Sequence, residues 1–259
     1  MSFRIDDLFS GDTIDTKNGG TMRIGVWINV AGILAGGLLG YMCGSHLKQR
    51  MQDSLTAVCG ISVIFIGISG AMEGMLRVAG NSISSGNAML VTVCLALGTL
   101  VGEMLNIEGL FESFGQWLKL KTGNAKDQNF VNGFVSASLT VCIGAMAIVG
   151  SIQDGILGDW SILATKAILD LIIIMVMTCS MGKGCVFSAI PVLIFEGVIT
   201  LFASFLQPIM TDAAMADLSL VGSVLIFCVG INLVFGKKVS VANMLPSVVF
   251  AVIAAFLPL

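Results

Sequence analysis

The stretch LATKAILDLIIIMVMT, residues 163–178, has the apolar content of a helix that crosses a lipid bilayer, yet it carries Lys166 and Asp170. A spanning helix needs about 20 mainly apolar residues, and the neighbouring residues extend this run to 161–181. Each charge inside such a helix costs about 2.5–3.5 kcal/mol on insertion scales. Whether the stretch spans a membrane therefore decides both the fold and the meaning of its two charges.

The composition answers the first question. Of 259 residues, 56% are hydrophobic and 11% are charged, and the mean hydropathy is +0.97. Soluble domains are about 25% charged, so the chain is expected to be an all-α, polytopic transmembrane helix bundle in contact with membrane lipid. The net charge of −3 offers no basic face to nucleic acid, which excludes that class of partner.

Catalytic and metal-binding patterns are missing from the sequence. It has one histidine, and it lacks a Ser/His/Asp set, a zinc-protease motif and a phosphate-binding loop. The seven cysteines form no CxxC pair. We therefore expect no enzyme, no metal site and no cofactor, although an intramembrane enzyme acting on lipid is a third alternative for the function.

Eight apolar segments are candidate spans, and they are separated by short polar loops. They cover residues 25–44, 54–73, 87–106, 130–151, 161–181, 185–207, 217–235 and 241–258. The polar, glycine-rich residues 1–21 are expected to be a disordered N-terminal extension, and residues 22–259 a single integral membrane domain. Eight spans would place both termini on the same side.

Orientation follows from the distribution of Lys and Arg, which concentrate in cytoplasmic loops. Four residues lie on one side: Arg4, Lys17, Arg23 and Arg77. Eight lie on the other side: Lys48, Arg50, Lys119, Lys121, Lys126, Lys183, Lys237 and Lys238. The larger set is expected to face the cytoplasm.

The long loop contains IEGLFESFGQWLKLK, residues 107–121, in which Leu110, Phe111, Phe114 and Trp117 recur at helical spacing. This pattern predicts a short amphipathic helix lying on the membrane interface. A plain interfacial anchor and a functional gate are both compatible with it.

Internal echoes suggest duplication. GILAGGLLGYM (32–42) aligns with CLALGTLVGEM (94–104), and SGAMEGML (69–76) with GSIQDGIL (150–157), as in a duplicated helical hairpin. A weaker echo aligns LTAVCGISVIFIGIS (55–69) with LSLVGSVLIFCVGIN (218–232), two helices expected to run in opposite directions, as in an inverted repeat. The GxxxG steps in the first pair predict close helix packing or, alternatively, an unwound helix that exposes carbonyls.

Polar groups at membrane depth are the candidate site residues, because they tend to face a cavity or a partner. Lys166 and Asp170 are four residues apart, so they share a helix face and can pair. A structural ion pair and a site where a ligand competes with that pair both fit this spacing. The full candidate set is Asp170, Lys166, Gln153, Asp154, Glu103, Asn29, Asn232 and Glu196.

Each remaining acid has an alternative interpretation. Glu103 lies near a span end, where a boundary carboxylate touches water. Asp154 and its repeat counterpart Glu73 could cap turns or line an outer vestibule. Glu196 has no local partner, and Pro191 just before it predicts a kink.

The blocks VSASLTVCIGAMAIVGSIQDGILGD, ATKAILDLI, FSAIPVLIFEGVITLFASFL and VGINLVFGKKVSVANMLP resemble the YqgA/YdfK-like bacterial inner-membrane proteins, a domain of unknown function. The resemblance runs from Met22 to the C-terminus and implies a multi-pass protein of the bacterial plasma membrane. It assigns no activity. Where the family pattern has Gln in YQG, this chain has Glu196 in FEG, so an amide can serve as the polar group at that position.

Two main hypotheses for the function follow. The first is a transporter or channel for a small solute or ion, in which Asp170 binds a cation or proton in alternation with Lys166, and its expected assembly is a homodimer. It predicts a water-filled cavity that reaches Asp170. The second is a non-transporting sensor or scaffold, which predicts that Asp170 and Lys166 are sealed against each other.

Overall fold

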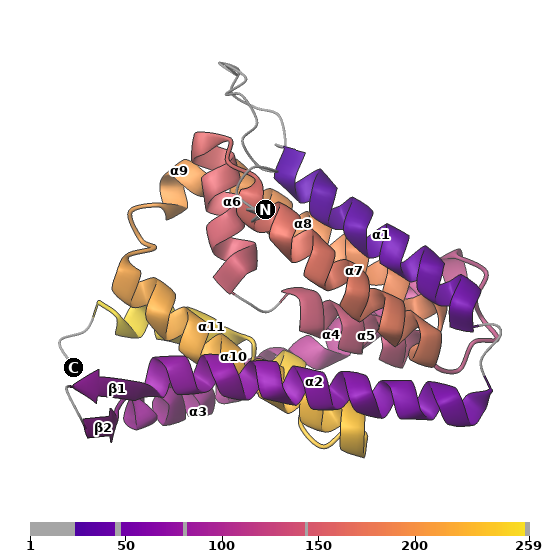
Figure 1. The fold of residues 1–259 in the computed structure, drawn as a ribbon, viewed down its shortest axis with the longest axis horizontal. Coiled ribbons are helices and arrows are strands. Elements are labelled where there is room, and N and C mark those ends of the chain that lie inside the picture. Colours follow the sequence, from indigo (N-terminus) through magenta and orange to yellow (C-terminus); the bar gives the residue numbers. More distant parts are fainter. Residues whose placement is uncertain (1–23, 45–47, 80–81, 143–144, 257–259) are drawn as a thin grey trace, which may run out of the picture.

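The computed structural model describes residues 24–44, 48–79, 82–142 and 145–256. The expected extension, residues 1–21, lies outside this part of the chain. The described residues are almost entirely helical, as predicted (Figure 1). Among them, six helices are long and apolar enough to cross a membrane, or seven spans if one bent pair is counted.

The elements follow one another with short connections. The N-terminal half holds α1 (Ile24–Gly44), α2 (Gln49–Met75), β1 (Leu76–Ala79), β2 (Ser82–Ser85), α3 (Ala88–Leu105), α4 (Ile107–Lys121), α5 (Phe130–Cys142) and α6 (Ala145–Leu157). The C-terminal half holds α7 (Ser161–Met181), the 3-10 helix η2 (Lys183–Ser188), α8 (Ala189–Leu201), α9 (Ala203–Leu206), α10 (Asp212–Phe235), the 3-10 helix η3 (Val241–Met244) and α11 (Pro246–Ala254).

The expected count of eight spans is too high. The segment 130–151 is divided between α5 and α6, whose axes differ by 62°. The segment 241–258 forms η3 and the nine-residue α11, and a helix of that length covers only about 14 Å at about 1.5 Å per residue. Counting continuous apolar segments therefore gave too many membrane-spanning helices, because hydropathy does not reveal where a helix breaks inside an apolar segment.

Two prolines in the C-terminal half lie at the starts of α8 and α11. Pro191 was expected to kink a helix, but it is the third residue of α8, and Pro246 is the first residue of α11. Proline has no backbone N–H, and this does not destabilise the first turn of a helix, because the N–H groups there have no intrahelical acceptor. Both prolines therefore mark places where a 3-10 helix passes into an α-helix.

The helices form two layers in Figure 1. The upper layer holds α1, α5, α6, α7 and α8, and the lower layer holds α2, α3, α10 and α11. We call the end of the bundle that contains β1 and β2 the hairpin end. The opposite side, toward which α10 ends and from which α2 begins, carries Lys48, Lys183 and Lys237, and we call it the lysine-rich end.

Glycines allow the helices of each layer to touch backbone to backbone, as the GxxxG steps predicted. A Cβ atom on each of three α1 glycines would lie 2.2–2.7 Å from a carbonyl oxygen of α7. The pairs are Gly32 with Ala167, Gly36 with Leu171, and Gly40 with Met175, so the two helices run parallel. In the lower layer, Gly67 of α2 presses on Phe227 of α10, and Gly102 of α3 presses on Asn243.

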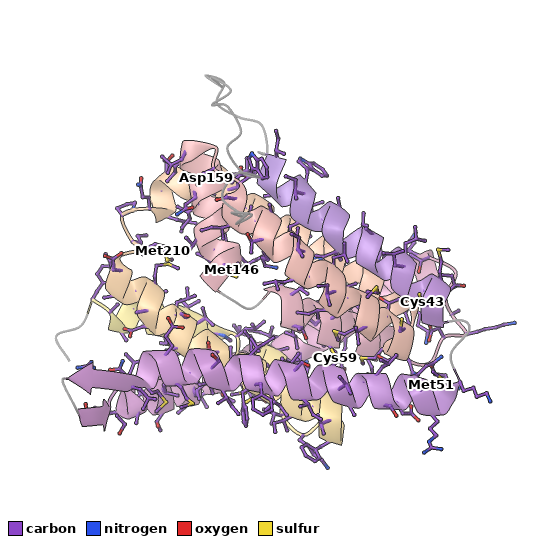
Figure 2. All side chains as sticks on the ribbon, viewed as in Figure 1. Cys43, Met51, Cys59, Met146, Asp159 and Met210 are labelled. Atoms are coloured by element: carbon purple, nitrogen blue, oxygen red, sulfur yellow. The ribbon has the colours of Figure 1, made fainter. Side chains whose placement is uncertain are left out.

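The duplicated hairpin is less evident in the structure than in the sequence. Its first copy contains α2, a single helix of 27 residues, whereas the matching part of the second copy is the broken pair of α5 and α6. Glu73 is exposed and its counterpart Asp154 is fully buried, so the two acids have different environments. All seven cysteines are free thiols distributed over both layers, for example Cys43 and Cys59 in Figure 2.

Candidate functional site

Lys166 is the centre of a polar cluster inside the upper layer. Its ammonium group forms an ion pair with Asp170, one turn further along α7. It also donates a hydrogen bond of 2.8 Å to the backbone carbonyl of Val141, in the last turn of α5, and its Nζ lies 3.6 Å from Oε1 of Glu196 on α8. Of the three N–H groups of an ammonium, two donate hydrogen bonds, to Asp170 and to Val141, and Glu196 lies at ion-pair distance.

Asn29 joins α1 to the same cluster. Its side-chain amide nitrogen donates a hydrogen bond of 2.8 Å to Oε1 of Glu196, which also faces Lys166. The interaction joins residues 167 positions apart in the sequence. The cluster therefore draws side chains or carbonyls from four helices: α1, α5, α7 and α8.

The cluster is enclosed by protein. Residue exposures are 6% for Lys166, 4% for Asp170, 1% for Glu196 and 0% for Asn29. Asp170 is the tenth of 21 residues in α7, which places it about 15 Å from the helix start at about 1.5 Å per residue. The cluster thus lies near the middle of a helix long enough to cross the hydrocarbon core of a membrane.

Two features leave room for a further positive group. The cluster pairs two carboxyl groups with one ammonium, so full ionisation would leave it with one uncompensated negative charge. In addition, Oδ1 of Asn29 and Oε2 of Glu196 are buried without a hydrogen-bond partner among the described residues. Both atoms are acceptors, and a buried acceptor without a donor is unfavourable. A cation or a proton is the group that would satisfy both conditions.

Asp154 lies close to this cluster on the hairpin side. It is fully buried, and its Oδ2 is 2.9 Å from the point that a Cβ on Gly25 would occupy. Gly25 is one helical turn before Asn29 on α1. Gln153, the preceding residue on α6, is half-buried. The structure therefore brings Asp154 near the predicted site, with Gln153 at its side.

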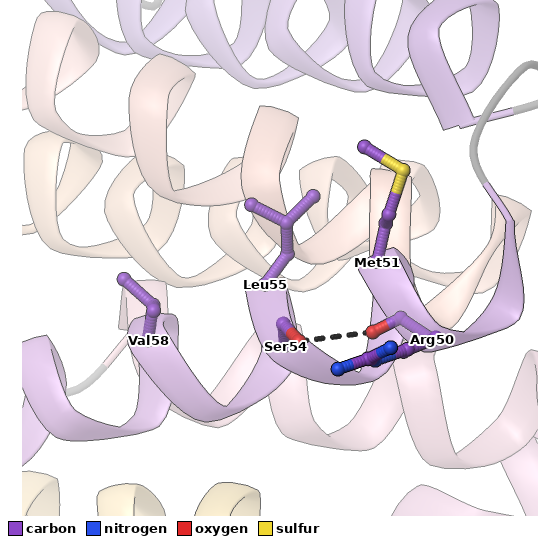
Figure 3. A pocket seen from close by; sticks show the side chains of 5 residues that line it. All are labelled: Arg50, Met51, Ser54, Leu55 and Val58. Atoms are coloured by element: carbon purple, nitrogen blue, oxygen red, sulfur yellow. Dashed lines mark hydrogen bonds between the residues drawn. The ribbon is translucent and has the colours of Figure 1, made fainter.

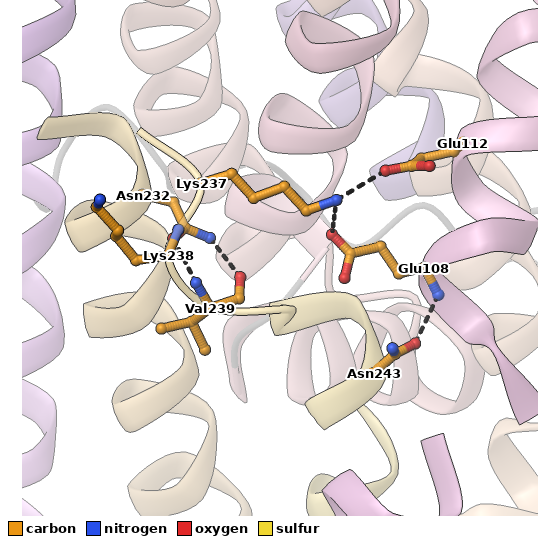
Figure 4. Close-up of polar contacts among 7 residues, drawn as sticks. All are labelled: Glu108, Glu112, Asn232, Lys237, Lys238, Val239 and Asn243. Carbon is orange, nitrogen blue, oxygen red and sulfur yellow. Dashed lines mark hydrogen bonds and ion pairs between the residues drawn. The ribbon is translucent and has the colours of Figure 1, made fainter. Parts of the chain in front are cut away.

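Glu103 and Asn232 have other roles. Glu103 is exposed near the end of α3, in the lower layer. Asn232 fixes the turn after α10, since its amide donates to the carbonyl of Val239 and its oxygen accepts from the backbone N–H groups of Lys238 and Val239 (Figure 4). Neither residue joins the cluster in this structure.

The amphipathic helix predicted at 107–121 is α4, with the bounds expected. Lys237, just after α10, reaches both Glu108 and Glu112 of α4 at 2.8 Å (Figure 4). The hydrogen bonds from Lys237 to Glu108 and Glu112 raise the pKa of Lys237 above its ordinary value. Asn243 accepts a hydrogen bond from the backbone N–H of Glu108, so α4 is tied to the lower layer at the lysine-rich end.

Two surface pockets of the described residues lie outside the cluster. One is an apolar hollow beside α2, lined by Arg50, Met51, Ser54, Leu55 and Val58 (Figure 3). The other lies between α4 and the start of α5, and its polar lining includes Asn106, Glu112, Gln116 and Asn132. Neither pocket is lined by Asp170 or Lys166. The water-filled cavity that the transporter hypothesis expected at Asp170 is therefore not among these two, and the cluster is occluded in this conformation.

Sequence reasoning included Glu196 without a local partner, and its partners Asn29 and Lys166 are supplied by other helices. It missed one member of the arrangement, the backbone carbonyl of Val141. The carbonyl of Val141 becomes available because α5 ends at Cys142, so its usual intrahelical donor is lost. A break inside the apolar run 130–151 was the only signal that could have revealed it, and hydropathy does not record such breaks.

Comparison with known proteins is consistent with this architecture. A family model described as "Protein of unknown function (DUF554)" matches residues 24–256. Uncharacterized protein YqgA of Escherichia coli (strain K12) is 30% identical over 234 residues, which cover 89% of this chain and 95% of the relative. Uncharacterized membrane protein YdfK of Bacillus subtilis (strain 168) is 28% identical over 232 residues, which cover 90% and 95%. No solved structure matches the chain. The resemblance in the sequence blocks is confirmed, and the chain belongs to the DUF554 family of membrane proteins of unknown function.

Proposed function

We propose that this protein moves a small monovalent cation, or a small solute coupled to one, across the membrane through the cluster of Lys166, Asp170, Glu196 and Asn29. The observation that carries the proposal is the excess of buried acceptors over donors: two carboxyl groups face one ammonium, and two oxygens have no donor. Intramembrane ionisable groups of this kind mark ion or proton pathways by default.

The proposed mechanism alternates the partners of Asp170. In the occluded state, the Lys166 ammonium occupies the carboxylate of Asp170. When the site opens to water, a cation or proton binds between Asp170 and Glu196, and Lys166 retains its bond to the Val141 carbonyl. The carboxyl end of α5 adds a partial negative charge at this point, which also favours a cation.

The test is reconstitution in liposomes with a panel of ions (Li⁺, Na⁺, K⁺ and H⁺) and small metabolites. Wild type is compared with Asp170→Asn and Glu196→Gln, which keep side-chain size and remove charge. Glu103→Gln is the matched control, because Glu103 is exposed in the other layer. We expect wild type and Glu103→Gln to carry a cation or release protons on binding it, and the two site variants to lose this activity. Fluxes that are the same for wild type and Asp170→Asn, with every ion and metabolite of the panel, would refute the proposal.

A sensor or scaffold is the second candidate. The observation that favours it is the closure of the cluster, in which Lys166 and Asp170 are sealed against each other. In that case Asp170→Asn would change stability and leave every flux at the level of empty liposomes.

Location and assembly are also proposals. We infer a bacterial inner-membrane protein whose lysine-rich end faces the cytoplasm, and a homodimer as its assembly. Reporter fusions at Lys48 and Lys238 test the orientation, because both positions should give a cytoplasmic signal. Light scattering in detergent, corrected for bound detergent, tests the dimer.

A further inference from the structure

Helices α2 and α10 correspond in sequence and in extent. The stretches LTAVCGISVIFIGIS of α2 and LSLVGSVLIFCVGIN of α10 align without a gap at a shift of 163 residues, which places Gly67 on Gly230. The same shift carries Gln49, the first residue of α2, onto Asp212, the first residue of α10. The echo seen in the sequence therefore coincides with the helix boundaries.

The next helix along each half also corresponds. SGNAMLVTV, residues 85–93 at the start of α3, aligns with SVANMLPSV, residues 240–248 at the start of η3 and α11. The two share Ser, Met, Leu and Val at matching places, and Thr92 matches Ser247. The shift is 155 here, eight fewer than for α2 and α10, because the β1–β2 hairpin lengthens the connection between α2 and α3.

The preceding helix completes the correspondence. The shift of 163 carries α1 onto residues 187–207, which contain α8 and α9. Three consecutive helices in the N-terminal part thus match three consecutive segments in the C-terminal part: α1 with α8 and α9, α2 with α10, and α3 with η3 and α11. In each set the first helix belongs to the upper layer and the other two belong to the lower layer (Figure 1).

The matching helices of α2 and α10 touch each other through equivalent residues and run in opposite directions. A Cβ on Gly67 would lie 2.5 Å from the backbone nitrogen of Phe227, and a Cβ on Gly230 would lie 2.7 Å from the backbone nitrogen of Ile64. Phe227 is the counterpart of Ile64 under the shift of 163. Each contact is therefore the other one repeated by a two-fold rotation.

The other two pairs obey the same rule. Leu95 of α3 and its counterpart Phe250 of α11 pack into one hydrophobic cluster. Helices α1 and α8 meet where Asn29 bonds to Glu196. A two-fold axis would bring residue 31 against its counterpart, residue 194, and the observed contact is two positions from this point on each helix. Gly37 of α1 lies against Val186, just before α8, so this pair is also antiparallel.

We propose that residues 24–105 and 187–256 form an inverted repeat, and that its approximate two-fold axis passes beside the Asn29–Glu196 contact. We further propose that the protein has two conformations, related by this axis, which open the cluster alternately to the hairpin end and to the lysine-rich end. This second step rests on the proposed transport function. Binding at the interface of inverted repeats, with exchange between two such states, is a common transporter architecture.

The repeat also fixes the number of sites. The counterpart of Asn29 is Val192 and the counterpart of Glu196 is Ile33, and both counterparts are buried in the hydrophobic core. The polar contact therefore exists on only one side of the axis. One cation per chain is expected, reached from either end, rather than two symmetric sites.

Distances between spin labels test the two conformations. Labels carried by a non-canonical amino acid leave the seven native cysteines in place. The first pair, Ser85 with Asp159, spans the two layers at the hairpin end, and the second, Lys183 with Lys238, spans them at the lysine-rich end. Ser85 with Asp212 is the control pair within the lower layer. These five positions are all exposed.

We expect two populations for each pair that spans the layers. A change of cation or pH should lengthen one distance while it shortens the other, and the control distance should stay constant. Single distances that do not change in protein that still binds the cation would overturn the two conformations and leave the site intact. Distances that lengthen together at both ends would also overturn them, because that result means general loosening. Cation binding, measured by calorimetry on the same samples, reports on the transport proposal separately.

Discussion

Replacing Lys166 with Met measures what holds the buried cluster together. The substitution removes the ammonium, which is the donor that the carboxylate of Asp170 and the carbonyl of Val141 share. Breaking a buried ion pair from one side destabilises a protein by about 3–5 kcal/mol. Replacing both partners with apolar residues of similar size is often neutral, so the double variant Lys166→Met, Asp170→Leu should recover most of the loss. The loss in the double variant should therefore fall short of the sum of the two single losses by at least about 3 kcal/mol.

The assay is SDS-induced unfolding in mixed micelles, followed by the fluorescence of the three tryptophans. Thr165→Val is the matched control, because Thr165 is the residue before Lys166 and is exposed. It should change the free energy of unfolding by less than about 0.5 kcal/mol. A Lys166→Met variant as stable as wild type would refute the argument, since the ammonium could not then be an essential partner of Asp170 and Val141. A double variant no more stable than the single one would show that Glu196 also depends on Lys166.

Three further predictions concern packing, a turn and pH. Gly36→Ala places a Cβ 2.2 Å from the carbonyl oxygen of Leu171, so it should destabilise the α1–α7 pair by about 1–3 kcal/mol. Gly86→Ala is the control and should leave the stability unchanged, because its Cβ would meet only a flexible arginine side chain at 3.3 Å. SDS-induced unfolding of both variants measures the difference. Asn232→Ala removes the hydrogen bonds that fix the turn after α10, and it should make cleavage by trypsin in this turn faster than in wild type. The hydrogen bonds from Ser161 lower the pKa of Asp159. The ionised carboxylate therefore stabilises the fold at pH values above its ordinary pKa, and this contribution is lost as the pH falls through the lowered pKa. Asp159→Asn should make the free energy of unfolding depend less on pH in the acid range.

Local patterns in the sequence predicted most of the upper layer. Apolar length alone located α7 at 161–181, the bounds that the structure has. The spacing of Lys166 and Asp170 predicted their ion pair, because residues four apart share a helix face. The glycines at 32, 36 and 40 predicted a close helix contact, and the carbonyls of α7 fill that space. These successes all depend on periodicity within one helix.

The rest of the site depends on contacts between distant helices, which periodicity does not encode. The bond between Asn29 and Glu196 joins α1 to α8, and no spacing relates them. The carbonyl of Val141 becomes an acceptor only because α5 ends within an apolar run. Asn232 resembled a membrane-depth ligand, but a turn that follows it uses both ends of its amide. Polar type and depth therefore indicated candidates, and only the packing separated the members of the buried cluster from turn residues.

A purely structural role for the buried cluster does not explain why it contains the carboxyl group of Glu196. One ion pair between Lys166 and Asp170 would be enough to orient α7, and an apolar pair would serve stability equally well. A third ionisable group on α8 adds a buried charge with no counter-charge of its own, and one of its oxygens has no partner. The proposed cation site gives this carboxyl a reason, because a negative charge at Glu196 would set the charge of the species that binds. An amide at the same position would keep the hydrogen bond to Asn29 and leave the charges of Lys166 and Asp170 balanced.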